Sequence, residues 1–450
     1  MKLIIIGAGP GGYETAVEAA RRGIEVVLIS DGPLGGTCLN EGCIPTKTLL
    51  HAAEQLPEGE TPADAALATA QKHKRAVVEQ LRGGIALLLG NKLITLVEGH
   101  ASFAGPHCVT VPGPEGERRF EGDAILVAVG SVSASLPIPG ADLPGVLSSR
   151  EILELERVPR SLCIIGGGVI GLEFASLYRS FGAEVTVLEY APSLLPRFDT
   201  DLSKRLRQAL VRRGIAVETS ARVEAIDGGD AFSVRFSDKS CAERSVAAEC
   251  VLMAVGRRAA LSSLNFEAIG IECSPRGVVV DDNFETSVPG VYAVGDVTGR
   301  MMLAHEASAQ GLRALNHICL CADGGSGVPD DGLDFSIIPA AVFTTPELAC
   351  VGLSEEDCKA SGQEFRALKA FYRANGKAVS MDAGDGYCKV LADPVSGRIL
   401  GAHILGAHAS DLIHEAAALM QFGVDAKRAG SLIHAHPTLS EVLQAALRSF

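Results

Sequence analysis

Two parts of the chain share one pattern: a short apolar run, a glycine-rich turn, an amphipathic stretch and a second apolar run. Both turns have the spacing Gly-x-Gly-x-x-Gly, and their glycines are Gly7, Gly9 and Gly12 and then Gly166, Gly168 and Gly171. The pattern predicts strands at 3–6, 25–29, 162–165 and 184–188, and helices at 13–22 and 172–181. The sequence therefore predicts one strand–turn–helix–strand unit twice, as an internal repeat.

Outside the two units the pattern is more varied. Helical spacing predicts helices at 46–56 and 64–89, and a strand-rich section at about 93–120 interrupts the first unit before a strand at 124–129. Further strands are expected at 251–255 and within 290–296. Alternating strands at 367–372, 387–392 and 399–405 then precede helices at 409–422 and 425–430. Residues 322–334 are rich in turn formers and have no assigned element.

These elements predict an α/β fold with two Rossmann-like dinucleotide-binding domains and a C-terminal α+β domain. We expect the boundaries 1–143 and 144–264 for the two dinucleotide-binding domains. We expect a central domain at 265–334, which completes the first dinucleotide site. The C-terminal domain then spans 335–450.

The glycine spacing has a physical purpose in a dinucleotide-binding turn. The first glycine allows the tight bend, the second lets the backbone approach a pyrophosphate, and the third lets the helix pack closely on the strand. The phosphates lie at the helix N-terminus, where free N–H groups favour anions. A single copy is also typical of an ordinary glycine turn, but two copies in full context favour dinucleotide binding.

An acidic residue is expected at the end of the second strand of each unit, where it accepts hydrogen bonds from ribose hydroxyls. In the second unit this residue is Glu189, whose carboxylate would repel a ribose 2′-phosphate and therefore favours NAD over NADP. In the first unit the equivalent position is Ser30, so Asp31 is the substitute candidate.

Composition narrows the possible partners and compartment. The 450 residues carry a formal net charge of −14 and have no basic run, which argues against nucleic acid and anionic membrane as partners. No apolar stretch is long enough to span a bilayer, and the first strand begins directly after Met1 and Lys2, so we expect neither a transmembrane segment nor a leader. Twelve scattered cysteines are typical of reduced thiols in the cytoplasm. We predict no metal site.

Cys38 and Cys43 differ from the other cysteines because they flank a short segment that contains Asn40 and Gly42. Five residues of regular helix rise about 7.5 Å, whereas a disulfide needs Cα atoms within about 7 Å, so a bridge requires an irregular turn. Pro45 suits the first turn of a following helix, whose N-terminus would stabilise a nearby thiolate. The pair is therefore a candidate redox centre, with two unrelated buried thiols as the alternative.

Together these motifs resemble the flavin-dependent pyridine nucleotide-disulfide oxidoreductase family over essentially the whole chain. The resemblance is carried by the first glycine turn at 7–12, Gly-Gly-Thr-Cys to Cys-Ile-Pro-Thr-Lys at 35–47, the second turn with Leu172 and Glu173, Gly295-Asp296, Leu303-Ala304-His305, and His-Ala-His-Pro-Thr-Leu-Ser-Glu at 434–441. At position 41, between the two cysteines, this chain has a glutamate where relatives usually have a small apolar residue. A carboxylate facing the sulfurs would raise the thiol pKa, whereas one facing solvent would not.

The resemblance implies FAD at the first site and NAD at the second. The implied FAD contacts are Gly7, Gly9, Pro10, Gly12, Ser30, Asp31, Gly36, Thr37, Lys47, Ala101, Gly130, Ser131, Asp296 and Ala304. The implied NAD contacts are Gly166, Gly168, Val169, Ile170, Gly171, Glu189, Ala221 and Gly256.

The resemblance also implies oxidation of protein-bound dihydrolipoamide to lipoamide with NAD⁺ as electron acceptor. Cys38 would exchange with substrate, Cys43 would face the flavin, and the two would cycle as a disulfide. Lys47 would pair with Glu173 near the flavin. His436, oriented by Glu441, would be the base that serves the disulfide of a partner subunit in a homodimer with shared active sites. The substrate would be carried by a lipoylated protein of a 2-oxoacid dehydrogenase or of a glycine cleavage system.

Several alternatives remain open at this point. Thr438 to Glu441 is also a capping-box sequence at the start of a helix, and the two roles of Glu441 are compatible. His434 is expected to be structural. A glutathione reductase-like activity would require basic residues in place of Glu189, and a mercuric reductase-like activity would require a C-terminal cysteine pair, which this chain lacks. A non-catalytic structural subunit is the alternative of a different class.

Overall fold

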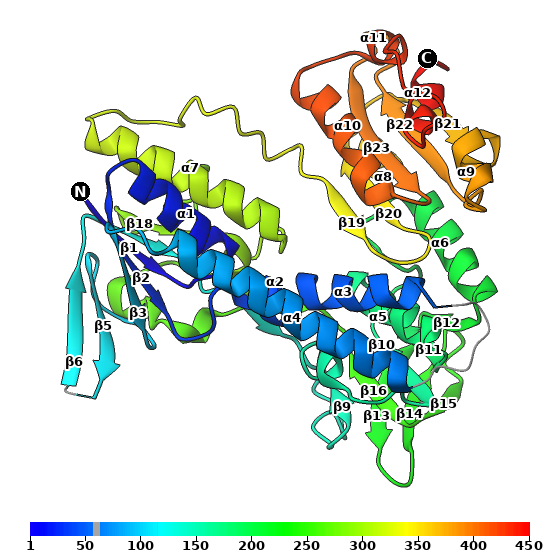
Figure 1. Cartoon of the computed structure of the whole chain (residues 1–450), viewed down its shortest axis with the longest axis horizontal. Coiled ribbons are helices and arrows are strands. Elements are labelled where there is room, and N and C mark those ends of the chain that lie inside the picture. Colours follow the sequence, from blue (N-terminus) through cyan, green and yellow to red (C-terminus); the bar gives the residue numbers. More distant parts are fainter. Residues whose placement is uncertain (57–63, 115) are drawn as a thin grey trace. The chain divides into compact units, whose positions relative to one another are not determined.

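The computed structural model describes residues 1–56, 64–114 and 116–450, which form two compact units (Figure 1). One unit comprises Met1–Thr48, Ala70–Ala134 and Arg257–Leu333. The other comprises Leu49–Thr69, Ser135–Gly256 and Asp334–Phe450. Each unit has its own buried apolar clusters, so each segment of the chain contributes to a hydrophobic core.

The first unit contains a five-stranded parallel sheet with the strand order β18-β7-β1-β2-β3. Its strands are β1 (Lys2–Ile6), β2 (Glu25–Ser30), β3 (Ile94–Glu98), β7 (Ala124–Val127) and β18 (Val291–Ala293). Strands β1 and β7 are apolar and buried over nearly their whole length, as parallel strands covered on both faces must be. The helices of these segments are α1 (Pro10–Arg21), α2 (Gly36–Glu41), α3 (Cys43–Glu54), α4 (Asp64–Leu88) and α7 (Ala304–Ala322).

The second unit contains a five-stranded parallel sheet with the strand order β12-β11-β10-β16-β9. Four of its strands, β10, β11, β12 and β16, have the order of β1, β2, β3 and β7, but the edge strand β9 precedes them in the chain whereas β18 follows. Its strands are β9 (Val146–Leu147), β10 (Ser161–Ile165), β11 (Glu184–Glu189), β12 (Ile215–Thr219) and β16 (Cys250–Met253), and its helices are α5 (Val169–Ser180) and α6 (Thr200–Arg212). The predicted internal repeat is therefore confirmed at the level of strand order.

The repeat extends beyond the glycine turns. In each copy a three-stranded antiparallel sheet is inserted along the chain, between β3 and β7 in the first unit and between β12 and β16 in the second. These insertions are β4 (Ser102–Gly105), β5 (Cys108–Gly113) and β6 (Gly116–Glu121), and β13 (Arg222–Asp227), β14 (Phe232–Ser237) and β15 (Glu243–Ala248). The strand-rich pattern predicts that the interruption of the first unit begins at about Leu93. Because β3 pairs with β2 and so belongs to the parallel sheet, the insertion begins at β4 instead.

A second five-stranded sheet of the second unit is antiparallel, with the order β19-β20-β23-β22-β21. Its strands are β19 (Ala340–Val342), β20 (Leu348–Gly352), β21 (Arg366–Phe371), β22 (Tyr387–Ala392) and β23 (Ile399–Leu405), with helices α8 (Glu355–Ser361), α9 (Gly376–Ser380), α10 (Ala409–Gln421), α11 (Ala426–Gly430) and α12 (Glu441–Leu447). The expected α+β arrangement of this segment is confirmed. Sequence patterning missed β19 and β20, which are short and lack a clear alternation.

The remaining elements are short. They are β8 (Ser131–Ser133), which pairs antiparallel with β17 (Arg257–Ala259), and the 3₁₀ helices η1 (Glu151–Glu154), η2 (Leu261–Ser263), η3 (Phe266–Ile269), η4 (Gly295–Thr298) and η5 (Tyr372–Ala374). Within the described part of the chain, no helix is long and apolar enough to cross a membrane.

The segment after α7 is held by a buried ion pair. Arg313 donates two hydrogen bonds of 2.7 Å to the Asp331 carboxylate, and the two side chains are only 8% and 10% exposed. Burial opposes ionisation of Asp331, but hydrogen bonds from Arg313, Asn316 and the Leu333 N–H lower its pKa below the usual value. This pair orders residues for which the sequence pattern predicts no element.

We expect Arg313→Leu to lower the free energy of unfolding by about 3–5 kcal/mol, because Asp331 would remain buried without its cation. Since the folded-state pKa of Asp331 is lowered, its contribution is complete above the unfolded pKa of about 3.9 and is lost as the pH falls. Urea denaturation at pH 7 and below pH 4 checks this, and the gap between wild type and variant should shrink in acid. Arg235→Leu, which removes an exposed pair with Asp227, is the control and should change nothing measurable.

Candidate active site

The two predicted glycine turns have the same geometry. Gly9 and Gly168 are the N-cap residues of α1 and α5, and neither helix has a side-chain cap or an acidic residue in its first turn. A Cβ added to either glycine would meet no atom within 4 Å. The N–H groups of each first turn therefore face open space, and both turns fit a pyrophosphate group.

The outer glycines of each turn are enclosed by backbone instead. A Cβ on Gly12 would collide with the carbonyl oxygen of Gly7, and a Cβ on Gly171 would collide with that of Gly166. Pro10 occupies the first helical position after Gly9, and Val169 and Ile170 occupy the equivalent positions after Gly168. The first and third glycines are thus enclosed in both copies as the spacing predicts, whereas the approach of the second glycine to a pyrophosphate stays a prediction.

The acidic position differs between the turns. Glu189 ends β11, and its two carboxylate oxygens accept hydrogen bonds from the N–H groups of Gly167 at 2.5 Å and Ala191 at 2.6 Å. In the first turn the Ser30 hydroxyl donates to the Gly32 carbonyl, and the Asp31 carboxylate pairs with His100 at 2.9 Å. The carboxylate of the second turn is therefore fixed beside the glycines, whereas Asp31 has a histidine partner that the sequence did not indicate.

We expect Gly168→Ala to weaken NADH binding at least tenfold, a change of about 1.4 kcal/mol, while the thermal unfolding midpoint stays near the wild-type value. The backbone angles of Gly168, φ −82° and ψ −176°, suit alanine, and its new methyl group would meet no protein atom. The methyl group would instead occupy the space that fits the pyrophosphate. Fluorescence titration with NADH checks this, and wild-type affinity in the variant would mean that the second turn holds no phosphate.

A polar cluster of the first unit joins residues far apart in the sequence. The Ser131 hydroxyl donates to the Asp296 carboxylate at 2.5 Å and accepts from Arg257 Nε at 2.7 Å. The neighbouring Gly295 N–H donates to the buried Gln310 side chain at 2.7 Å. The structure thus brings together two of the predicted cofactor residues, Ser131 and Asp296. It adds Arg257 and Gln310, which sequence reasoning missed because only the pairing of β8 with β17 and the packing of α7 bring them there.

Other predicted cofactor residues belong to nearby segments of each unit. Gly36 begins α2 with φ +59°, and a Cβ there would lie 2.7 Å from Gly9 Cα, so close packing on the first turn requires a glycine. The others are Thr37 in α2, Ala101 before β4, Gly130 before β8, Ala304 at the start of α7, Ala221 after β12 and Gly256 before β17. Their contacts with a cofactor stay predictions.

Cys38 and Cys43 lie on either side of a break between two helices. Cys38 is in α2, Cys43 begins α3, and Gly42 between them has the non-helical angles φ −144° and ψ −110°. The predicted irregular turn is therefore present, and Pro45 lies in the first turn of α3 as expected. Glu41, the last residue of α2, is half-buried.

Cys38 and Cys43 are free thiols in the structure, and their cycling as a disulfide stays a prediction. The two thiols interact, and a hydrogen bond with Cys43 together with burial raises the pKa of Cys38. Cys38 is half-buried and Cys43 is exposed. Because dithiol and disulfide are two oxidation states of one pair, contact between the two sulfurs fits a redox centre.

Lys47 and Glu173 belong to different units, and their pairing stays a prediction. Lys47 is in α3, next to the redox pair in sequence. Glu173 is buried in α5, where its carboxylate accepts a hydrogen bond from the Phe343 N–H at 3.1 Å.

His436 and Glu441 form a hydrogen-bonded pair at the start of α12, with His436 Nδ1 2.9 Å from Glu441 Oε1. The other oxygen of Glu441 accepts from the Thr438 N–H at 2.8 Å. This backbone hydrogen bond, followed by the contact with His436, lowers the pKa of Glu441. The imidazole is 78% exposed, so its second nitrogen is accessible.

The capping-box interpretation is half correct. Glu441 bonds back to the Thr438 N–H, but it is the first residue of α12, and Ser440 is the N-cap. The Thr438 hydroxyl donates to the Ala435 carbonyl instead of capping the helix. His434 is only 9% exposed and pairs with Glu415 at 2.7 Å, which fits the structural role expected for it.

The described residues contain no group of three or more histidine, cysteine, aspartate or glutamate side chains that could hold a metal ion. The first unit offers a pair of thiols, and the second offers an imidazole bonded to a carboxylate.

Known proteins share this arrangement over the whole chain. A dihydrolipoyl dehydrogenase of Bacillus subtilis is 37% identical, with 100% of this chain and 98% of the relative covered. The mitochondrial dihydrolipoyl dehydrogenase of Pisum sativum and the leghemoglobin reductase of Glycine max are each 35% identical over 99% of this chain, with 90% and 86% of their own lengths covered.

Solved structures give the same result. The HOCl-induced flavoprotein disulfide reductase RclA from Escherichia coli superposes with a TM-score of 0.88 at 31% identity and covers 99% of both chains. LpdA from Mycobacterium tuberculosis also has a TM-score of 0.88, at 25% identity, and covers 100% of this chain and 99% of its own. Residues 338–447 match the dimerisation domain of the pyridine nucleotide-disulphide oxidoreductases. Since residues 1–311 match the main domain of the same proteins, this chain belongs to the pyridine nucleotide-disulphide oxidoreductase family.

Proposed function

We propose that the chain is an FAD-containing dihydrolipoyl dehydrogenase, which oxidises protein-bound dihydrolipoamide with NAD⁺ as electron acceptor. The observation that carries the proposal is the contact between Cys38 and Cys43 at the helix break, in a chain that matches dihydrolipoyl dehydrogenases over its full length. The hydrogen-bonded pair of His436 and Glu441 adds the base that dithiol oxidation needs.

The hydrogen bond to Glu441 determines which nitrogen of His436 acts as base. A carboxylate only accepts hydrogen bonds, so His436 Nδ1 carries the proton and donates it to Glu441 Oε1. Nε2 is then unprotonated and free to take a proton from a substrate thiol. The dimerisation domain supports a homodimer in which this imidazole serves the cysteine pair of the partner subunit.

The cysteine disulfide would oxidise the dihydrolipoyl dithiol in two thiol–disulfide exchanges. A dihydrolipoyl thiol gives its proton to His436, and the resulting thiolate attacks Cys38 of the oxidised pair, forming a mixed disulfide and releasing Cys43 as a thiolate. The second lipoyl thiol then attacks the lipoyl sulfur of the mixed disulfide and displaces Cys38, which takes up the proton of that thiol and leaves as a thiol. Lipoamide leaves as a disulfide, having lost two electrons and two protons, and the cysteine pair has gained the two electrons.

The two dinucleotide sites support FAD in the first unit and NAD in the second. When bound, FAD and NAD⁺ supply the two-electron acceptor chemistry that returns the cysteines to a disulfide. The glycine turns would hold the pyrophosphates, and Ser131 and Asp296 would complete the FAD site. Glu189, fixed by two backbone N–H groups, favours NAD because it would repel a 2′-phosphate.

The partner we propose is a lipoylated carrier protein of a 2-oxoacid dehydrogenase or a glycine cleavage system. The twelve cysteines are all free thiols, which fits a cytoplasmic setting in which only Cys38 and Cys43 cycle.

A coupled assay tests the proposal. Purified protein reconstituted with FAD should reduce NAD⁺ with dihydrolipoamide, and NADP⁺ should be a poor substitute. If NADH oxidation with glutathione disulfide or Hg²⁺ exceeds dihydrolipoamide oxidation, the protein is a different reductase of the family. If none of these reactions occurs in the FAD-loaded protein, it is a non-catalytic subunit.

A further inference from the structure

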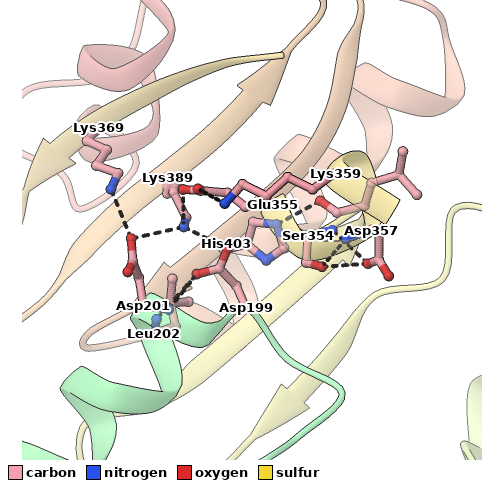
Figure 2. Close-up of polar contacts among 11 residues, drawn as sticks. Asp199, Asp201, Leu202, Ser354, Glu355, Asp357, Lys359, Lys369, Lys389 and His403 are labelled. Carbon is pink, nitrogen blue, oxygen red and sulfur yellow. Dashed lines mark hydrogen bonds and ion pairs between the residues drawn. The ribbon is translucent and has the colours of Figure 1, made fainter. Parts of the chain in front are cut away.

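A buried lysine of the C-terminal sheet is paired with carboxylates from a different segment of the second unit. Lys389, in β22, is 1% exposed, and its Nζ lies 2.6 Å from Asp199 Oδ2, which is equally buried (Figure 2). The same ammonium lies 2.8 Å from Glu355 Oε1 in α8 and 3.4 Å from Asp201 Oδ2. One cation therefore joins β22 to the start of α6.

Asp199 is also the last residue of the loop that follows Glu189. It is the N-cap of α6, and its Oδ1 accepts from the N–H groups of Asp201 at 3.1 Å and Leu202 at 3.4 Å. Residues 190–199 therefore run from the carboxylate beside the second glycine turn to the carboxylate held by Lys389.

The middle of this loop packs on the glycine turn. The Leu195 N–H donates to the Gly167 carbonyl at 3.1 Å, and a Cβ on Gly167 would lie 3.0 Å from Glu189 Cβ. Leu195 is buried with φ +47°, a left-handed conformation that non-glycine residues adopt only where surrounding contacts hold them. Leu195 itself makes the contact with Gly167, and Asp199 follows it at the end of the loop.

We propose that Lys389 is a positioning residue for the NAD site, acting through Asp199 to hold the loop 190–199 against Gly167 and Glu189. The inference rests on the proposed function, because it takes the second glycine turn as the NAD site. Lys389 does not touch the turn; it fixes the far end of the loop whose near end carries Glu189.

The charges explain why a lysine is required at this position. Burial opposes the charged form of Lys389, but its contacts with Asp199 and Glu355 raise its pKa, so the ammonium persists. Without it, the Asp199 carboxylate would be buried without a cation, and water or rearrangement of the loop would be needed to solvate it. The exposed Lys369, which pairs with Asp201 at 3.1 Å, is not in the path from Asp199 to the turn.

The test compares Lys389→Met with Lys369→Met in the FAD-loaded protein. We expect Lys389→Met to raise the Kd for NADH and the KM for NAD⁺ at least tenfold, with the kcat at saturating NAD⁺ and the KM for dihydrolipoamide within about twofold of wild type. Lys369→Met should leave all four values unchanged. Direct titration with NADH measures the change in Kd without any catalytic turnover.

The double variant Asp199→Asn/Lys389→Met separates positioning from stability. Asparagine still caps α6 and removes the uncompensated charge, so the double variant should unfold at a higher temperature than Lys389→Met but still bind NADH weakly. If Lys389→Met does not fold, NADH binding is measured on the double variant instead. Wild-type NADH affinity in either Lys389→Met or the double variant would overturn the role of Lys389. A wild-type protein that does not bind NADH would overturn the proposed function itself.

Discussion

Cys43→Ser is expected to lower dihydrolipoamide:NAD⁺ turnover by about four orders of magnitude or more, because serine cannot form the disulfide through which the electrons pass. Cys38→Ser should have an equal effect, since either loss removes the whole redox pair. The two thiols lie on either side of the helix break at Gly42 and interact through a hydrogen bond. Steady-state NADH formation measures the loss.

The control for this experiment is the exposed Cys241→Ser, which should keep wild-type turnover. NADH oxidation by ferricyanide, which needs FAD but no thiol, should persist in both Cys38→Ser and Cys43→Ser and would show that the cofactor sites are intact. A Cys43→Ser protein that retains dihydrolipoamide-dependent NAD⁺ reduction would refute the proposed mechanism.

His436→Gln is expected to lower kcat/KM for dihydrolipoamide by about 10²–10⁴-fold, which is the usual contribution of a general base. The imidazole is exposed and bonded only through Nδ1, so Nε2 is the atom that the variant removes from the reaction. Ferricyanide reduction by NADH should be unaffected, because it involves no substrate thiol. His408→Gln, which replaces an exposed histidine elsewhere in the same unit, is the matched control.

Glu441→Gln should have a separate, diagnostic effect. The glutamine oxygen can still accept from the Thr438 N–H, but its amide would then donate to His436 Nδ1 and leave the proton on Nε2. The base would be blocked although the helix start is preserved, so kcat/KM for dihydrolipoamide should fall about 100-fold without loss of thermal stability. If turnover instead equals that of wild type, Glu441 does not set the tautomer of His436.

Local sequence was sufficient for the features whose partners are close along the chain. The glycine spacing fixes which glycine meets backbone and which faces open space, and Gly42 between the cysteines breaks the helix as its backbone freedom allows. His436 and Glu441 are five residues apart, so one turn at the start of α12 joins them.

Other contacts could not be read from the sequence. His100 as the partner of Asp31, and Arg257 beside Ser131 and Asp296, depend on which strands pair and in which register. β19 and β20 have no clear alternation by which periodicity could recognise them, and they are stabilised by the pairing of β19 with β20 and of β20 with β23.

Short-range patterns in the sequence predict the repeated dinucleotide unit and the candidate thiol pair, and the family resemblance adds the pair of His436 and Glu441. Each of these features depends on backbone geometry over a few residues. Long-range packing alone fixes that four strands in each copy share one order, with an inserted three-stranded sheet, and that Lys389 meets Asp199 across 190 positions of the chain. Such pairs are selected by the packing of separate sheets and by the need of buried charges for partners, and neither leaves a periodic signal in the sequence.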